Sequence, residues 1–177
     1  KAISNHMMKS INTSAHVHLM TEIDVTEIVN FVKANQDSFY EKENFTLTYT
    51  PFILMSTIKA LKNHPLVNAS LINESIHYHK HINIGLAVSI EDGLMVPTIF
   101  NCEEKNFLGL CRSVNEIANR TRSNEITPDE LGGSTFSITN FGVFGIMAGT
   151  PIINQPNVGI LGCLLYTSDA ADDSLRV

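Results

Sequence analysis

The seven histidines of this sequence are the side chains best suited to bind a metal or to transfer a proton near neutral pH. His16 and His18 alternate along one segment, and His77, His79 and His81 alternate along another. Alternating residues share one face of a strand, so either set could present imidazole nitrogens to a metal ion. No carboxylate or thiolate is spaced to complete either set locally. We therefore expect packed or solvent-facing histidines and no metal site.

Motifs for covalent catalysis and phosphate binding are missing from the sequence. It contains neither the G-x-S-x-G of a serine hydrolase nor the G-x-x-x-x-G-K of a P-loop, and the glycines within 142–145 do not follow the dinucleotide-binding pattern. Cys102, Cys111 and Cys163 form no C-x-x-C pair, which predicts neither a zinc site nor a disulfide framework and fits a reducing compartment. Their apolar surroundings argue against a thiolate nucleophile.

The chain has 177 residues, of which 44% are hydrophobic and 17% are charged, with a net charge of −6. This composition excludes a fibrous or disordered protein and is sufficient for a hydrophobic core. The acidic balance argues against nucleic acid as a partner, because a phosphate-binding surface needs an excess of Lys and Arg. No apolar run reaches the roughly 18 residues that cross a bilayer, so we expect no membrane partner. The absence of a starting Met and of a signal-peptide pattern suggests that the chain begins inside a longer one.

Hydrophobic periodicity predicts an α/β domain in two layers, a mixed sheet with helices packed on it. The first predicted helix is 1–12. The second is capped by Asp24, and the polar stretch 36–44 either ends it or extends it as a frayed segment. A buried helix is predicted from Thr50-Pro51 to His64-Pro65, a further helix runs from the cap at Asn106 to Thr121, and a capping box at Thr127 begins one more turn. The predicted strands are 16–23, 68–72, 75–78, 82–90, 94–100, 135–139 and 158–162.

The end of the chain differs from the rest. From Cys163 onward the sequence loses its periodicity and becomes polar. The amino-acid sequence of this part resembles the translation of sequencing-adapter read-through. We therefore expect the native domain to span 1–162 and a non-native or disordered tail to occupy 163–177.

Ten short phrases, in order along the chain, carry a resemblance to one family. They are ISNHM at 3–7, TSAHV at 13–17, EIDVT at 22–26, LTYTPF at 47–52, NAS at 68–70, INIGLAV at 82–88, GLMVP at 93–97, FSITN at 136–140, GVFG at 142–145 and TPIIN at 150–154. Together they resemble the catalytic domain of the dihydrolipoamide acyltransferase component of 2-oxo acid dehydrogenase complexes. The resemblance covers the chain from Lys1 to about Gly162, and the order of the phrases makes it specific.

This resemblance implies a chloramphenicol-acetyltransferase-like fold that assembles as trimers within a larger cage, with active sites at subunit interfaces. The implied reaction moves an acyl group between coenzyme A and a dihydrolipoyl group carried by a separate lipoyl domain. The implied partners are that lipoyl domain, further copies of the chain and the other components of the complex. The implied compartment is the cytoplasm, or the mitochondrial matrix in a eukaryote.

The resemblance also assigns roles to individual residues. Thr139 matches the hydroxyl that hydrogen-bonds the tetrahedral oxyanion, and Thr48, Ser89 and Asn140 match positions near the coenzyme A channel. The general base of the family is a histidine within His-x-x-x-Asp-Gly, which deprotonates the attacking thiol. This sequence has no such motif, because its only Asp-Gly is Asp92-Gly93 and the residue four positions earlier is a valine. We therefore expect a C-terminally truncated catalytic domain that is inactive as it stands.

Two alternatives remain open at the level of sequence. One is a non-catalytic structural subunit that keeps the core of the complex and has lost the base. The other is an antibiotic O-acetyltransferase of the same fold, which the number of lipoamide-type phrases disfavours. The phrase 139–145 is more similar to succinyl and branched-chain members of the family than to acetyl members, so we expect one of those acyl groups.

Overall fold

The computed structural model describes residues 2–91, 93–142 and 149–164. Its α-helices are α1 (Ala2–Thr13), α2 (Thr26–Glu43), α3 (Thr50–Asn63) and α4 (Phe107–Arg122), and its short 3-10 helices are η1 (Pro65–Asn68), η2 (Cys102–Glu104) and η3 (Pro128–Leu131). Its strands are β1 (Ala69–Ile72), β2 (Ser75–Tyr78), β3 (Ile84–Leu86), β4 (Val88–Ile90), β5 (Gly93–Met95), β6 (Thr98–Ile99), β7 (Phe136–Asn140) and β8 (Ile160–Cys163). None of the described helices combines the length and apolar character that spanning a membrane requires.

A four-stranded mixed sheet with the order β6-β3-β7-β8 forms the centre of the fold. Strand β3 pairs antiparallel with β6 and parallel with β7, and β7 pairs parallel with β8. Helices α3 and α4 pack against each other and enclose a core in which Leu54, Ile84 and Ile138 are completely buried. The predicted architecture, a mixed sheet with packed helices, is confirmed.

The helix starts follow the local chemistry of the sequence. The side chain of Asn106 accepts a hydrogen bond of 2.8 Å from the amide of Gly109, and Asp24 accepts one of 2.9 Å from the amide of Thr26. Thr127 and Glu130 form the predicted capping box at the start of η3. These side chains satisfy amides that lack a partner at the start of a helix. The predicted caps at Asn106 and Thr127 are confirmed, whereas α2 and α3 differ by one residue from the prediction, with Val25 and Tyr49 at the N-cap and no side-chain cap.

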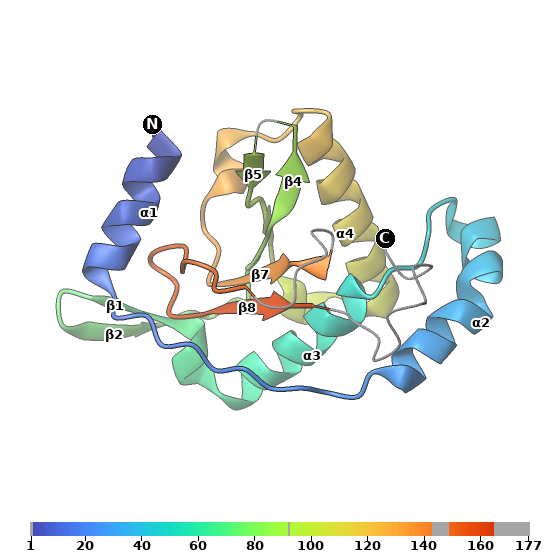
Figure 1. Ribbon diagram of the computed structural model, residues 1–177, viewed down its shortest axis with the longest axis horizontal. Coiled ribbons are helices and arrows are strands. Elements are labelled where there is room, and N and C mark those ends of the chain that lie inside the picture. Colours follow the sequence, from blue (N-terminus) through green and yellow to red (C-terminus); the bar gives the residue numbers. More distant parts are fainter. Residues whose placement is uncertain (1, 92, 143–148, 165–177) are drawn as a thin grey trace.

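The prediction of a strand over 16–23, in the segment between α1 and α2, is wrong. The alternation over 16–23 predicted a strand, but within the described residues this segment pairs with no strand and crosses the molecule between α1 and α2 (Figure 1). Its apolar side chains face solvent, and Leu19 is 93% exposed. Alternation fixes only the two faces of a strand, whereas a sheet also requires a neighbour to receive the backbone hydrogen bonds.

Three further boundaries differ from the predictions. The run 82–90 is divided into β3 and β4, which belong to different sheets, because β3 pairs with β6 and β7 whereas β4 pairs with β5. Its return, 94–100, is divided into β5 and β6 at Pro97, which has no amide hydrogen to donate. The strand predicted at 158–162 is β8, which covers Ile160–Cys163. The polar stretch from Gln36 extends α2 to Glu43, which is one of the two expected outcomes. Residues 165–177 lie outside the described ranges, so the expected tail stays a prediction.

A second hydrophobic cluster joins α2 and the segment before α3 to α4. Val32, Leu47 and Cys111 are its buried members. Phe52 and Phe107 stack beside them with ring centroids 4.6 Å apart. This cluster places the segment 45–50 over one end of α4, where it forms a wall of the cavity described below.

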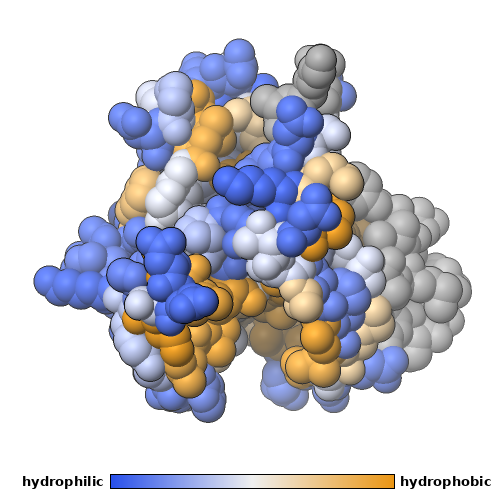
Figure 2. Space-filling view, turned by 90° about the vertical axis from the view of Figure 1, so that its left-hand side faces the viewer, coloured by the Kyte–Doolittle hydropathy of each residue, from blue (hydrophilic) through white to orange (hydrophobic). Residues whose placement is uncertain are grey.

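Apolar side chains also remain exposed on the side of the molecule that carries α1 and the β1–β2 hairpin. Figure 2 shows patches of hydrophobic residues on this side, separated by hydrophilic ones. The large apolar residues exposed on α1 and on the hairpin are Met8, Ile11, Leu71, Ile72, Ile76 and Tyr78. Exposed apolar patches bordered by polar residues are typical of protein–protein interfaces.

Candidate functional site

The four residues singled out in the sequence line one cavity of about 450 Å3. Thr48 comes from the segment before α3, Ser89 from β4, and Thr139 and Asn140 from the end of β7. These elements are separated by 40 to 50 residues in the chain, and only the fold brings them together. The predicted site residues are therefore neighbours around one space.

Thr139 occupies a rigid position in this cavity. Its strand, β7, is paired on both sides, and Thr139 itself lies opposite Gly162 of β8. The Cys163 thiol donates to the Thr139 carbonyl at 3.4 Å, and Thr139 is only 6% exposed. A hydroxyl on a strand held from both sides is suited to a role that requires a fixed hydrogen-bond donor.

Asn140 is oriented by its own turn. Its side-chain oxygen accepts a hydrogen bond of 2.8 Å from the amide of Gly142. Within the described residues its side-chain nitrogen has no protein acceptor, so both of its hydrogens remain available. Asn140 therefore adds a second donor beside Thr139.

Much of the remaining lining of the cavity is apolar. Leu47, Leu86, Val88 and Val114 line it, together with the thiol-bearing Cys111. Burial raises the pKa of Cys111 to about 11, and burial also raises the pKa of Tyr49, a further lining residue. The Cys111 thiol is therefore protonated at neutral pH, which agrees with the expectation that no cysteine acts as a thiolate nucleophile.

The sequence reasoning missed several polar residues of the cavity, among them Asn115 and Arg122 of α4. They lie on this helix beside Cys111, Val114 and Ala118, all of which line the cavity. The prediction for this helix considered only its apolar positions up to Thr121. Polar residues that flank an apolar stripe at helical spacing are the signal that could have identified them.

The cavity contains hydrogen-bond donors but no general base. Among its described lining residues there is no His, Asp or Glu, and Arg122 is the one charged side chain. Such a site can bind an acyl group, donate to a developing oxyanion and attract an anionic ligand. It cannot remove a proton from a thiol with the described residues alone.

The histidines lie elsewhere and do not converge on a metal. His16 contacts the segment 150–154, since the Ile153 amide donates a hydrogen bond to its Nε2 at 3.1 Å. His79 Nε2 lies 2.8 Å from Ser70 Oγ, whereas His81 Nδ1 lies 2.7 Å from a carboxylate oxygen of Glu103. Adjacent alternating histidines thus have different partners.

One group of possible metal ligands occurs in the described part of the chain. It consists of His81, Glu103 and Glu104. Both carboxylate oxygens of Glu103 already accept hydrogen bonds, one from His81 and one from the amide of Ile82. Burial alone would raise the pKa of Glu103, but these hydrogen bonds outweigh it and hold the pKa below its usual value. The contacts therefore explain this carboxylate without a metal.

Comparison with known proteins gives the family. The model of the 2-oxoacid dehydrogenases acyltransferase (catalytic domain) family matches residues 1–168. The chain belongs to this family. It is similar to the dihydrolipoyllysine-residue succinyltransferase component of the 2-oxoglutarate dehydrogenase complex of Bacillus subtilis, with 35% identity over 92% of the chain and 39% of the relative. It is also similar to the acetyltransferase component of the acetoin cleaving system of the same organism, with 38% identity over 92% of the chain and 41% of the relative.

Solved structures of acyltransferase catalytic domains share the fold of this family member. A probable dihydrolipoamide acetyltransferase from Listeria monocytogenes matches with a TM-score of 0.88 and 35% identity, over 91% of this chain and 69% of that one. The cubic core of a pyruvate dehydrogenase multienzyme complex matches with a TM-score of 0.86 and 33% identity, over 91% and 67%. The chain thus spans about two fifths of the length of these two curated relatives and about two thirds of the solved domains.

Proposed function

We propose that the cavity around Thr139 is the acyl-binding and oxyanion-binding part of a site that moves an acyl group between coenzyme A and a dihydrolipoyl group. The observation that carries this proposal is the convergence of Thr48, Ser89, Thr139 and Asn140 on one cavity of about 450 Å3. Family membership supports it, since the relatives are named as acyltransferase components of several dehydrogenase complexes.

The reaction begins when the thiolate of one substrate attacks the thioester carbonyl of the other. The carbonyl oxygen becomes an oxyanion, to which the Thr139 hydroxyl donates a hydrogen bond. The intermediate then collapses, the original carbon–sulfur bond breaks, and the second thiolate leaves. Because the hydroxyl is fixed before the charge develops, little reorganisation is required at the transition state.

Coenzyme A is the ligand that we assign to Thr48, Ser89 and Asn140. Their hydroxyl and amide groups suit the amide-rich arm of this substrate, and the adjacent Arg122 suits a phosphate group. The lipoyl group arrives on a separate carrier domain. The apolar wall formed by Leu47, Leu86 and Val88 suits the hydrocarbon part of an acyl chain.

We propose that the general base comes from outside the 177 residues. The chain has no His-x-x-x-Asp-Gly, and the described lining of the cavity has no titratable base. We therefore propose that this chain alone catalyses no transfer. Self-association into trimers and a larger cage, with the lipoyl domain and the other components of the complex as partners, is part of the same proposal. The exposed apolar residues of α1 and of the β1–β2 hairpin support it.

The acyl group that we favour is succinyl or branched-chain, on the basis of the phrase that begins at Thr139-Asn140. Curated relatives of the chain include succinyltransferase, acetyltransferase and branched-chain acyltransferase components at 34–38% identity. Because one methylene in an apolar pocket changes binding by only about 1–3 kcal/mol, the preference should be a ratio of rates and not an absolute selection.

A chimera tests the proposed activity. Residues 1–162 would be joined to the remaining C-terminal part of the Bacillus subtilis succinyltransferase, and transfer from acyl-CoA to dihydrolipoamide would be measured. We expect transfer by the chimera and none by the 177-residue chain. A folded chimera without transfer would refute the acyltransferase proposal and favour the alternative, a structural core subunit without catalytic function. Comparing kcat/KM for succinyl-, isobutyryl- and acetyl-CoA in the same chimera tests the acyl preference.

A further inference from the structure

A second cavity, of about 610 Å3, is separate from the acyl-transfer cavity. The segment 79–83, the loop 131–135 and the segment 154–156 form its walls, and His6 of α1 also lines it. No described residue lines both cavities. The proposed acyl transfer therefore leaves this space without a role.

The lining of this cavity is rich in side-chain nitrogen donors, on a chain that is acidic overall. His6, His79, Lys80 and His81 line it, and no Asp or Glu is among its described lining residues. The whole chain carries a net charge of −6. Within the described residues neither Lys80 nor His6 is in an ion pair. The Lys80 ammonium and the His6 imidazole are thus available to a ligand.

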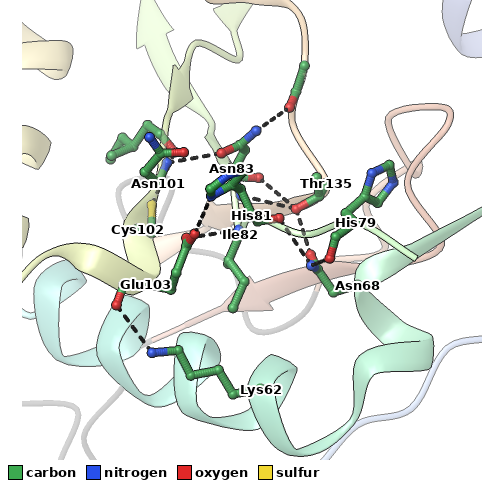
Figure 3. A network of polar contacts seen from close by, with 12 residues as sticks. Lys62, Asn68, His79, His81, Ile82, Asn83, Asn101, Cys102, Glu103 and Thr135 are labelled. Carbon is green, nitrogen blue, oxygen red and sulfur yellow. Dashed lines mark hydrogen bonds and ion pairs between the residues drawn. The ribbon is translucent and has the colours of Figure 1, made fainter. Parts of the chain in front are cut away.

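Buried Asn68 fixes the two principal walls relative to each other (Figure 3). Its side-chain nitrogen donates to the carbonyls of His79 and His81, at 3.3 and 3.2 Å, and its side-chain oxygen accepts from the hydroxyl of Thr135 at 2.6 Å. Asn68 is only 5% exposed. The histidine segment and the glycine loop are therefore held in position before any ligand binds, which lowers the entropy cost of binding.

The glycine loop that lines the same cavity carries backbone donors without a backbone partner. Thr98 donates to the carbonyl of Gly132 at 2.9 Å, and Asn83 donates to the carbonyl of Gly133 at 3.1 Å. Within the described ranges the amides of Gly133 and Ser134 have no backbone acceptor. Successive unpaired amides are a recognised form of anion site, and these two belong to residues that line the same cavity as Lys80.

We propose that this second cavity binds a small molecule that carries a multiply charged phosphate group. Lys80, His6 and the amides of Gly133 and Ser134 would bind the phosphate oxygens with charge-assisted hydrogen bonds. The volume exceeds that of a bare phosphate and lies in the range of sites for whole small molecules. A nucleoside diphosphate and a simpler phosphorylated compound share this chemistry.

Calorimetric titration of the 177-residue chain with pyrophosphate and with ADP, at constant ionic strength, tests the proposal. We expect saturable binding to one site, weakened about tenfold by Lys80→Ala or by His6→Ala. Both positions are exposed, so the variants should fold. Lys59→Ala is the matched control, because Lys59 is an exposed lysine of α3 that lines neither cavity. Amide NMR should show shifts of Gly133 and Ser134 on binding.

Each outcome distinguishes the possibilities. Tighter binding of ADP would identify a nucleotide as the ligand class, and equal binding would identify the phosphate group as the whole recognition element. The proposal is overturned if neither probe saturates, if Lys59→Ala weakens binding as much as Lys80→Ala, or if Arg122→Ala alone abolishes binding. The last result would place the anion in the acyl-transfer cavity. Acyl transfer by the chimera is measured independently, so either proposal can fail alone.

Discussion

Replacing Asn68 by alanine should be one of the most destabilising polar substitutions in the described part of this chain. The side chain makes three hydrogen bonds, to two carbonyls and from one hydroxyl, and it is 5% exposed. A buried hydrogen bond contributes about 1 kcal/mol on average, and partners left unsatisfied add to the cost. We therefore expect the free energy of unfolding to fall by about 2–4 kcal/mol.

Urea denaturation of the purified chain measures this effect directly. Asn35→Ala is the control, because Asn35 makes one exposed hydrogen bond to the carbonyl of Phe31 and should change stability by less than about 0.5 kcal/mol. Asn68→Asp separates shape from hydrogen bonding, since a carboxylate keeps the acceptor for Thr135 but faces two carbonyls. It should destabilise at least as much as alanine. Equal stability of Asn68→Ala and Asn35→Ala would refute the reasoning that Asn68 joins the two walls.

Three further predictions concern charge and reactivity. Arg122→Ala in the active chimera should raise KM for coenzyme A about tenfold with little change in kcat, because the guanidinium is proposed to bind a phosphate group of this substrate. An unchanged KM would show that Arg122 does not bind coenzyme A. The Arg120 guanidinium, with help from Thr127, lowers the pKa of Glu130 from 4.5 to about 2. Ionised Glu130 therefore stabilises the fold above about pH 4.5, and this stabilisation is lost as the pH falls toward 2. The difference in free energy of unfolding between the chain and Glu130→Gln should narrow over that range. A difference that stays constant with pH would contradict this linkage. Burial raises the pKa of each of the three thiols to about 11. A thiol reagent at pH 8 should therefore modify the folded chain about 100-fold more slowly than the urea-unfolded chain. Rapid labelling of the folded chain would contradict this prediction.

The parts of the fold that depend on local chemistry could be predicted from the sequence. The caps at Asn106 and Thr127 and the proline at the start of α3 determine where helices begin, and each lies within a few residues of the amides that it serves. The turn between β1 and β2 is equally local, with Asn73 and Glu74 in the left-handed region. Such interactions can be recognised without knowing the rest of the structure.

Features that depend on distant partners could not be predicted in this way. The division of 82–90 into two strands depends on their partners, since β3 pairs with β6 and β7 whereas β4 pairs with β5. The unpaired state of 16–23 depends on which strands are present beside it. The hydrophobic pattern of these segments contained no information about their neighbours.

The candidate site also combines features that could be predicted from the sequence with features that depend on distant parts of the fold. Thr48, Ser89, Thr139 and Asn140 were identified by resemblance to a family, and the fold then brought them to one cavity. Asn115 and Arg122 were missed because only the apolar positions of their helix were considered. The second cavity could not be predicted from the sequence, where the alternating histidines indicated packed or solvent-facing side chains and gave no sign of the distant glycine loop that completes the cavity.

The most direct measurement for the central claim is the kcat of Thr139→Ala in the active chimera. If the Thr139 hydroxyl stabilises the oxyanion, kcat should fall about 100-fold or more while KM changes little. Thr57→Ala is the matched control, because Thr57 is also a buried threonine, its hydroxyl donates to the Ile53 carbonyl, and it lines neither cavity. An unchanged kcat for Thr139→Ala, or an equal loss in both variants, would contradict the assignment of this cavity to acyl transfer.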